Sequence, residues 1–196
     1  MKLFPTALLL VLSLTACVSV PGPSGASQWT IELASAAPAP DGTCKIYDEL
    51  NRLMLEGRLV AGKMDGVWTA WGSGGDRLAV LPYKNGVRSG AFQMWYGPFG
   101  DPTARGKLKL EGSFENGVFD GTVTRYFPTG AKRSIRIYGK GALASAHYWS
   151  PEGVELSPAE ARKAAAEELT SDERYLTALE AMVPQALAQA HRKIPG

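Results

Sequence analysis

Apolar and polar residues alternate through the middle of the chain, and this pattern predicts β-strands. Residues 107–111 read Lys-Leu-Lys-Leu-Glu, so both leucines fall on one side of an extended backbone and the charged residues on the other. In residues 132–138, Ile135 and Ile137 likewise share one face, and polar residues share the other. No helical spacing of apolar residues occurs in residues 44–156, which are therefore expected to form a β domain.

The β region repeats a pair of turn residues four positions apart. The pairs are Gly62 and Gly66, Gly86 and Gly90, Gly117 and Gly121, and Gly141 and Ser145. Their second members are 24, 31 and 24 positions apart, and we assign the seven-residue excess of the long step to a loop at 98–102. Asn85-Gly86 and Asn116-Gly117 are strong hairpin signals, because asparagine and glycine adopt positive φ readily. We therefore expect a meander of β-hairpins.

An aromatic residue recurs five positions after the second turn residue. Trp71, Trp95 and Tyr126 occupy this position, so they are expected to form a column on one face of the sheet. A second column contains Trp68, Phe92 and Val123. Both faces of a single sheet begin exposed, so we expect helices to cover one column. Two interpretations stay open for the aromatic residues: a structural ridge, or an aromatic-lined groove for a peptide or glycan.

The C-terminal segment, residues 157–196, has a helical pattern. Residues 157–160 form a capping box with proline at the first helical position. Thr170 and Glu173 repeat the box and predict the start of a second helix, which Pro184 is expected to kink or split. The predicted fold class is mainly β, a meander of β-hairpin repeats with a two-helix C-terminal segment.

The repeats resemble MORN repeats. Residues 56–68, 83–90 and 111–121 fit a pattern of Glu-Gly, an aromatic residue or leucine, Asn-Gly, and a second glycine four positions later. They resemble more closely the bacterial MORN-variant family, which includes antitoxin components. The resemblance implies an array of β-hairpins, and MORN repeats are often linked to membrane or lipid association.

The N-terminus has the pattern of a secretion signal. Lys2 precedes an apolar run at residues 3–14 that is too short to span a bilayer. Residues 14–17 read Leu-Thr-Ala-Cys and resemble the lipobox of bacterial lipoproteins. This resemblance implies removal of residues 1–16 as a signal peptide, and acylation of the Cys17 sulfur and its new amine with fatty acids such as palmitate. Two or more acyl chains would anchor the protein stably in a membrane.

The residues that follow Cys17 predict a location and a tether. In enteric-type bacteria, aspartate at the next position retains a lipoprotein in the inner membrane, so Val18 implies the outer membrane of the cell envelope. Residues 17–43 are rich in Pro, Gly, Ser and Ala and predict a flexible tether. Within it, residues 28–33 alternate and predict either an added edge strand or an apolar patch in a linker.

Cys44 has no intrachain partner if Cys17 carries lipid. Its position at the start of a strand-like stretch favours a buried side chain. The alternative is an intermolecular disulfide or a reactive thiol.

The formal net charge of +2 gives no reason to expect a nucleic-acid partner. Basic residues concentrate between positions 105 and 140. Four of them are candidate binding residues: Arg125, Lys132, Arg133 and Arg136. They predict contact with phospholipid headgroups, lipopolysaccharide phosphates or an acidic protein. The alternative is a solvated polar face that keeps the sheet from stacking on itself.

The sequence does not assemble an active site. Neither His147 nor His191 has the spacing of a metal ligand. Asp65 and Asp120 recur at one repeat position, where we expect their carboxylates to bond nearby backbone amides in turns. We therefore expect a non-enzymatic protein without metal or cofactor. An enzyme would require His147, Asp120 and either a serine or Cys44 to converge.

Together these patterns predict a lipid-anchored binding or scaffold protein of the cell envelope. Cys17 would provide the membrane anchor, and the repeat sheet would present aromatic and basic side chains to an unknown protein or an anionic envelope component. The alternative, which the family resemblance suggests, is an immunity or antitoxin protein that blocks a cognate toxin by direct binding.

Overall fold

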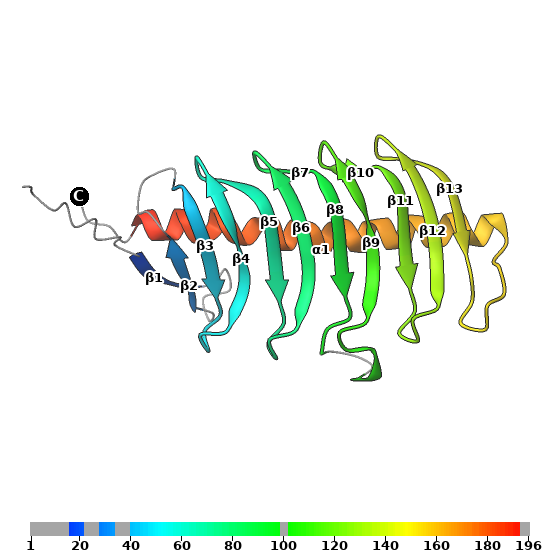
Figure 1. The fold of residues 1–196 in the computed structure, drawn as a ribbon, viewed down its shortest axis with the longest axis horizontal. Helices are drawn as coiled ribbons and strands as arrows, with labels where there is room; N and C mark the ends of the chain where they lie inside the picture. The colour runs from blue at the N-terminus through cyan, green and yellow to red at the C-terminus, as the bar shows by residue number, and fades with distance from the viewer. Residues whose placement is uncertain (1–15, 22–27, 34–39, 99–101, 193–196) are drawn as a thin grey trace, which may run out of the picture.

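The chain folds into one antiparallel β-sheet that a single long helix crosses on one face (Figure 1). The structure, a computed structural model, describes residues 16–21, 28–33, 40–98 and 102–192, with side chains for 33, 40–98 and 102–188. The predicted signal peptide lies outside the described residues except for Ala16.

The strands follow one another across the sheet in chain order. Their bounds are β1 (Ala16–Pro21), β2 (Gln28–Leu33), β3 (Gly42–Tyr47), β4 (Leu53–Val60), β5 (Lys63–Trp71), β6 (Arg77–Lys84), β7 (Val87–Arg88), β8 (Gly90–Trp95), β9 (Leu108–Glu115), β10 (Val118–Phe119), β11 (Gly121–Tyr126), β12 (Lys132–Gly139) and β13 (Ala142–Tyr148). The helices are η1 (Pro102–Ala104), a 3-10 turn, and α1 (Pro158–Arg192). The short β7 and β10 pair only with β6 and β9, and the remaining strands form one antiparallel meander. The predicted mainly β class is confirmed.

Four hairpins close on residue pairs that both adopt positive φ, as type I′ turns require. The pairs are Ala61-Gly62, Asn85-Gly86, Asn116-Gly117 and Lys140-Gly141, with φ between 48° and 87°. Adjacent hairpins are also bonded to each other, since the Gly86 N–H donates to the Met64 carbonyl at 2.7 Å and the Gly117 N–H donates to the Arg88 carbonyl at 2.9 Å. The turns that the repeated glycines predict therefore hold the repeats together as well as reversing the chain.

The loops at the other ends of the strands share one backbone geometry. In each loop, the N–H of the first residue donates to the carbonyl of the fifth residue. The N–H of the fourth residue donates to the carbonyl of the first. The residue pairs joined by the first of these bonds are Asp48 and Arg52, Gly72 and Asp76, Phe127 and Ala131, and Ser150 and Val154. Between β8 and β9 the corresponding bond joins Tyr96 to Lys107, eleven positions apart instead of four. The seven-residue excess thus lies in the loop that the sequence indicated.

The glycines of Glu56-Gly57 and Glu111-Gly112 make room for the core. A Cβ on Gly57 would lie 2.2 Å from the Trp68 ring, and a Cβ on Gly112 would lie 2.9 Å from Val123. Trp68 is fully buried, and its indole N–H donates to the Arg58 carbonyl at 3.0 Å. Close packing, rather than a turn, therefore requires glycine at this repeat position.

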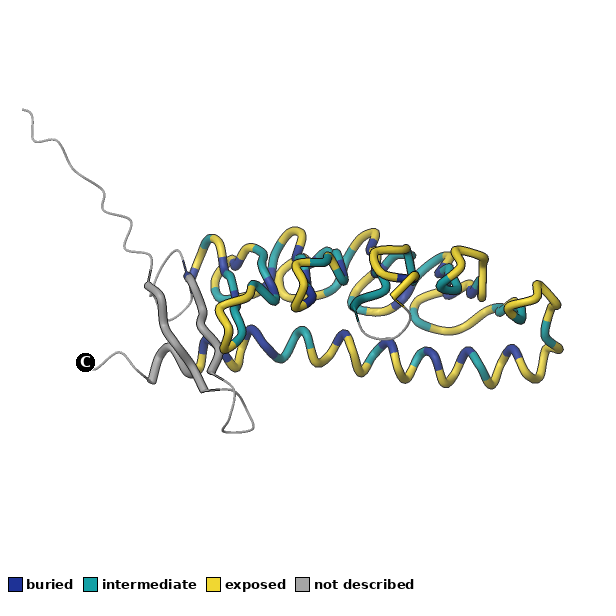
Figure 2. The backbone as a smooth tube through the Cα atoms, turned by 90° about the horizontal axis from the view of Figure 1, so that it is seen from below, coloured by how far each residue is buried: buried dark blue, intermediate teal, exposed yellow. Residues whose placement is uncertain are grey.

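The helix α1 covers the face that carries Trp68, Phe92 and Val123, all of which are buried. Figure 2 shows α1 running along one side of the strands, while no described segment lies on the other side. Burial of this column under the C-terminal segment confirms the expectation that a helix covers one face. Leu176 and Val183 of α1 are buried in the same core.

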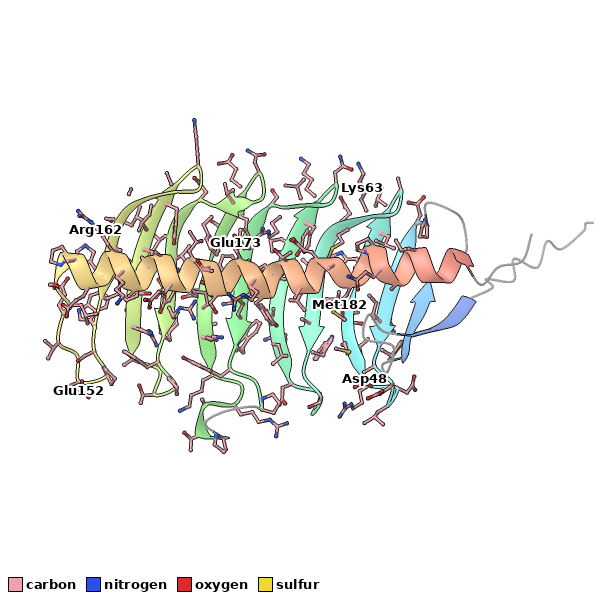
Figure 3. The ribbon with its side chains drawn as sticks, turned by 180° about the vertical axis from the view of Figure 1, so that it is seen from behind. Asp48, Lys63, Glu152, Arg162, Glu173 and Met182 are labelled. Atoms are coloured by element: carbon pink, nitrogen blue, oxygen red, sulfur yellow. The ribbon has the colours of Figure 1, made fainter. Side chains whose placement is uncertain are left out.

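Ion pairs also fasten the middle of α1 to the sheet. The Arg88 guanidinium lies 2.9 Å from Glu173 and 3.1 Å from Glu180, and the Tyr83 hydroxyl donates to Glu180 at 3.1 Å. Figure 3, seen from the helix side, places Glu173 near the middle of α1. Burial alone would lower the pKa of Arg88, but the two carboxylates outweigh it and raise that pKa.

The prediction of two C-terminal helices is wrong, because α1 continues from Pro158 to Arg192. The capping box at its start is present, with the Ser157 N–H donating to Glu160 at 3.0 Å. The second box does not form: the Thr170 hydroxyl donates to the Ala166 carbonyl one turn back, which is ordinary behaviour inside a helix. Pro184 lies at an exposed position inside α1 and does not divide it.

Residues 17–43, predicted as a tether, contain β1 and β2. Residues 28–33 form β2, as one of the two interpretations of their alternation predicted, but β2 is not at the edge. It pairs with β3 on one side and with β1 on the other, so β1 is the first strand of the sheet. Cys17 lies in β1, opposite Glu32.

Candidate functional site

A buried charge cluster joins the last strands of the sheet to α1. It consists of Arg125 on β11, Arg136 on β12, and Glu168 and Asp172 on α1. The Arg125 Nε lies 2.9 Å from Glu168, and its Nη2 donates to Asp172. The Arg136 Nη2 donates to the other Asp172 oxygen at 3.2 Å. Glu168 and Asp172 are four residues apart, so both carboxylates face the sheet from one side of the helix.

The ion pairs of the cluster are shielded from water because their side chains are buried. Arg125 is 7% exposed and Arg136 is 0% exposed. Burial alone would lower the pKa of Arg125, but Asp172 and Glu168 more than compensate and raise that pKa. The Tyr148 hydroxyl donates to Glu168 at 3.0 Å, and burial followed by the Glu168 charge raises the pKa of Tyr148.

This geometry corrects the expected basic face. Arg125 and Arg136 point toward the helix and form ion pairs with its carboxylates, so they are not exposed to a partner. Arg133 is about half exposed, with its Nε 3.0 Å from Glu168, and Lys132 is exposed. The alternation was read correctly, but the polar side of β12 is the covered side, and Ile137 is 43% exposed on the open side.

The open face of the sheet carries a continuous row of paired side chains. The strand register places Val80 opposite Gln93, Gln93 opposite Glu111, and Glu111 opposite Thr124. The neighbouring positions Ala79, Met94, Leu110 and Val123 are buried, so strand alternation directs the row away from α1. The Gln93 amide donates to Glu111 at 3.3 Å.

A shallow trough lies over this row. Its volume is about 520 Å³, and short side chains make its walls. Ala91, Ser113 and Thr122 line it beside the residues of the row, and Phe92 and Gly112 contribute to the lining. The trough therefore offers hydroxyl, amide and carboxylate groups in an open, elongated depression.

The predicted aromatic column reaches the trough at Tyr126. Trp71, Trp95 and Tyr126 occupy equivalent register positions in β5, β8 and β11, and all three are half-buried. The Tyr126 hydroxyl donates to Glu111 at 2.7 Å, and the Arg77 guanidinium lies 4.2 Å from the centre of the Trp95 ring. Ring faces beside hydrogen-bonding side chains are suited to flat, polar ligands such as sugar rings or extended peptides.

The residues of the enzymatic alternative are not brought together. Asp120 accepts the Lys140 N–H at 2.9 Å and Asp65 accepts the Asn85 N–H at 3.0 Å, which confirms their predicted turn role. His147 on β13 lies 2.8 Å from Glu155, and Cys44 is buried on β3 at the far end of the sheet. Among the described residues, no three His, Cys, Asp or Glu side chains gather as metal ligands.

The two cysteines occupy different environments. Cys44 is a free, fully buried thiol, as its strand position predicted, and burial raises its pKa to about 12. The side chain of Cys17 lies outside the described residues. Within the part of the chain that the structure describes, no helix combines the length and apolar character needed to cross a membrane.

Comparisons with known proteins leave the site to be judged on its own geometry. Models of known protein families were searched and none matches the chain, and no curated protein sequence matches it either.

Sequence reasoning missed the helix partners and the trough. The spacing of Glu168 and Asp172 places both carboxylates on one face of a helix, but it does not indicate that this face meets the sheet. Gln93, Glu111 and Thr124 have no signal in the sequence, since only the strand register brings them into one row.

Proposed function

We propose that this protein is a lipid-anchored binding protein of the cell envelope, held by lipid on Cys17, whose open sheet face receives a partner. The observation that carries the proposal is the asymmetry of the sheet. One face is closed by α1, whereas the other leaves the trough open. An antiparallel sheet commonly has one face packed on the core and the other in solvent, and here the solvent face carries a trough of hydrogen-bonding side chains that a partner can reach.

The chemistry of the open face favours a polymer with alternating polar and flat groups. Trp95 and Tyr126 offer ring surface, while Gln93 and Thr124 offer hydrogen bonds. Such a surface suits an envelope glycan or an extended protein segment. Lys132 is opposite Tyr126 in the strand register and adds positive charge at the rim, which favours an anionic partner.

Filling the trough is expected to abolish envelope binding. The substitution Cys17→Ala removes the proposed lipid anchor. Cosedimentation of this variant with isolated envelopes then reports binding by the sheet alone. Adding Ala91→Arg and Thr122→Arg places two long charged side chains in the trough, where both original residues are exposed. We expect at least a tenfold loss of affinity, about 1.4 kcal/mol.

The matched control adds Thr177→Arg and Ala178→Arg to the Cys17→Ala chain. These positions are exposed on α1 and receive the same charge from the same residue types. Binding that falls equally in both variants, or an unanchored chain that never binds envelopes, contradicts the proposal.

A further inference from the structure

A second cavity lies at the seam between the sheet and α1, separate from the open face. Its volume is about 290 Å³. Leu78, Met94 and Trp95 line it from β6 and β8, and Tyr175 lines it from α1. Most of the lining is apolar or aromatic, as in pockets that bind small molecules.

A recurring β-bulge puts one extra side chain into this seam in each repeat. The register passes directly from Leu55 to Leu53, from Ala79 to Arg77, from Leu110 to Leu108, and from Ser134 to Lys132. The residues skipped in these four steps are Met54, Leu78, Lys109 and Arg133. Three of them have recorded neighbours at the seam or core: Met54 packs against the core, Leu78 lines the cavity, and Arg133 lies 3.0 Å from Glu168.

Lys109 differs from the other bulged residues because it is charged and has no ion-pair partner among the described residues. Its side chain lines the cavity, and within the described residues its ammonium makes no ion pair or hydrogen bond. Its recorded contact is with the Tyr96 ring, whose centre lies 5.9 Å from the nitrogen. A partly buried ammonium without a hydrogen-bonded carboxylate of its own is available to pair with an anion.

The nearest carboxylate does not neutralise Lys109. Asp172 also lines the cavity, but Arg125 holds one of its oxygens and Arg136 holds the other. Burial is the main cause that lowers the pKa of Lys109 and repulsion from Arg125 adds to it, while the charges of Asp172 and Glu168 oppose this shift without reversing it. Among the described residues at this end of the seam, the four cations Lys109, Arg125, Arg133 and Arg136 therefore outnumber the two carboxylates that they face, Glu168 and Asp172.

We propose that the seam cavity binds a small amphipathic anion, a carboxylate whose head pairs with Lys109 and whose apolar body lies among Leu78, Met94 and Tyr175. An anion at this point restores the missing partner of the lysine, and the apolar lining accepts a short aliphatic or aromatic tail. The cavity and the trough share no lining residue, although Trp95 lines the cavity and also belongs to the aromatic column. The inference does not depend on the proposed envelope function, because Lys109 and the cavity lie outside the trough.

The test compares two probes of similar shape and different charge. Binding of hexanoate and of 1-hexanol to the full chain is measured by titration calorimetry. The purified protein is expected to bind hexanoate at least tenfold more tightly than 1-hexanol. Lys109→Met should remove this preference and Lys109→Arg should retain most of it. Lys84→Met, at an exposed position on β6, should leave it unchanged.

A second variant tests the location. Ser171 lines the cavity from an exposed position on α1, so Ser171→Phe should fill the cavity without a cost to the fold, and both probes should then fail to bind. Equal affinities for the two probes in the unmodified protein, anion preference that survives Lys109→Met, or undiminished binding to Ser171→Phe overturns the proposal.

Discussion

Replacing Asp172 with alanine is expected to lower the free energy of unfolding by about 3–5 kcal/mol. The change removes the carboxylate that both Arg125 and Arg136 contact, and leaves two guanidinium groups buried with only Glu168 to share. Removing one partner of a buried ion pair is costly because the remaining charge stays out of water without compensation. Urea denaturation followed by tryptophan fluorescence measures the loss.

Glu167→Ala provides the control, since Glu167 lies on the same helix and is exposed. It should change the free energy of unfolding by less than about 0.5 kcal/mol. Combining Asp172→Ala with Arg136→Met should cost less than the sum of the single changes, because one unpaired charge is removed as well. A cost for Asp172→Ala no greater than that of Glu167→Ala would show that the cluster does not hold the helix.

Gly57→Ala is expected to destabilise the protein by about 2–3 kcal/mol. The added methyl group would meet the Trp68 ring at 2.2 Å, and Trp68 has no space to withdraw because it is fully buried and hydrogen-bonded to Arg58. Thermal and urea unfolding should both show the loss.

Gly139→Ala separates this steric effect from the general consequences of losing a glycine. Gly139 also lies in a strand, and a Cβ there would meet no other atom within 4 Å. Its replacement should fall within about 0.5 kcal/mol of the original stability. Equal losses at the two positions would contradict the packing role assigned to the Glu-Gly glycine.

Local patterns predicted most of the fold, because strands and hairpins are encoded by neighbouring residues. The Asn-Gly pairs at 85–86 and 116–117 form the expected turns, and the excess in the long repeat lies near 98–102. The capping box at 157–160 likewise starts α1. The hairpin and capping signals depend on residues within one turn of each other, whereas the excess loop was located from the spacing of the repeats.

The face covered by the helix could not be predicted from alternation alone. On β12, alternation separates Ile137 from Arg136 but does not state which side meets water, and the polar side is the one that α1 covers. The usual preference of charges for solvent fails because Asp172 and Glu168 neutralise the arginines. The same pairing makes Asp172 a sheet contact, so the expected second helix start does not form.

The aromatic column shows the limit of repeat arguments. Spacing placed Trp71, Trp95 and Tyr126 at one repeat position, and the register confirms it. The trough beside them depends on Gln93, Glu111 and Thr124, which come from different repeats and meet only across paired strands. Non-local pairing of this kind leaves no mark in a single sequence.

Site-specific photo-crosslinking in intact cells tests most directly whether the open face receives a partner. A photoreactive residue replaces Gln93 in the trough in one strain and Arg174, exposed on α1, in another. Our account predicts crosslinks to an envelope component from position 93 and none above background from position 174. One protein captured in high yield would identify the partner as a dedicated protein, as an immunity role requires, whereas captured glycan would identify an envelope polymer. Crosslinks from position 174 alone, or from neither position, would contradict the claim that the open face is the binding surface.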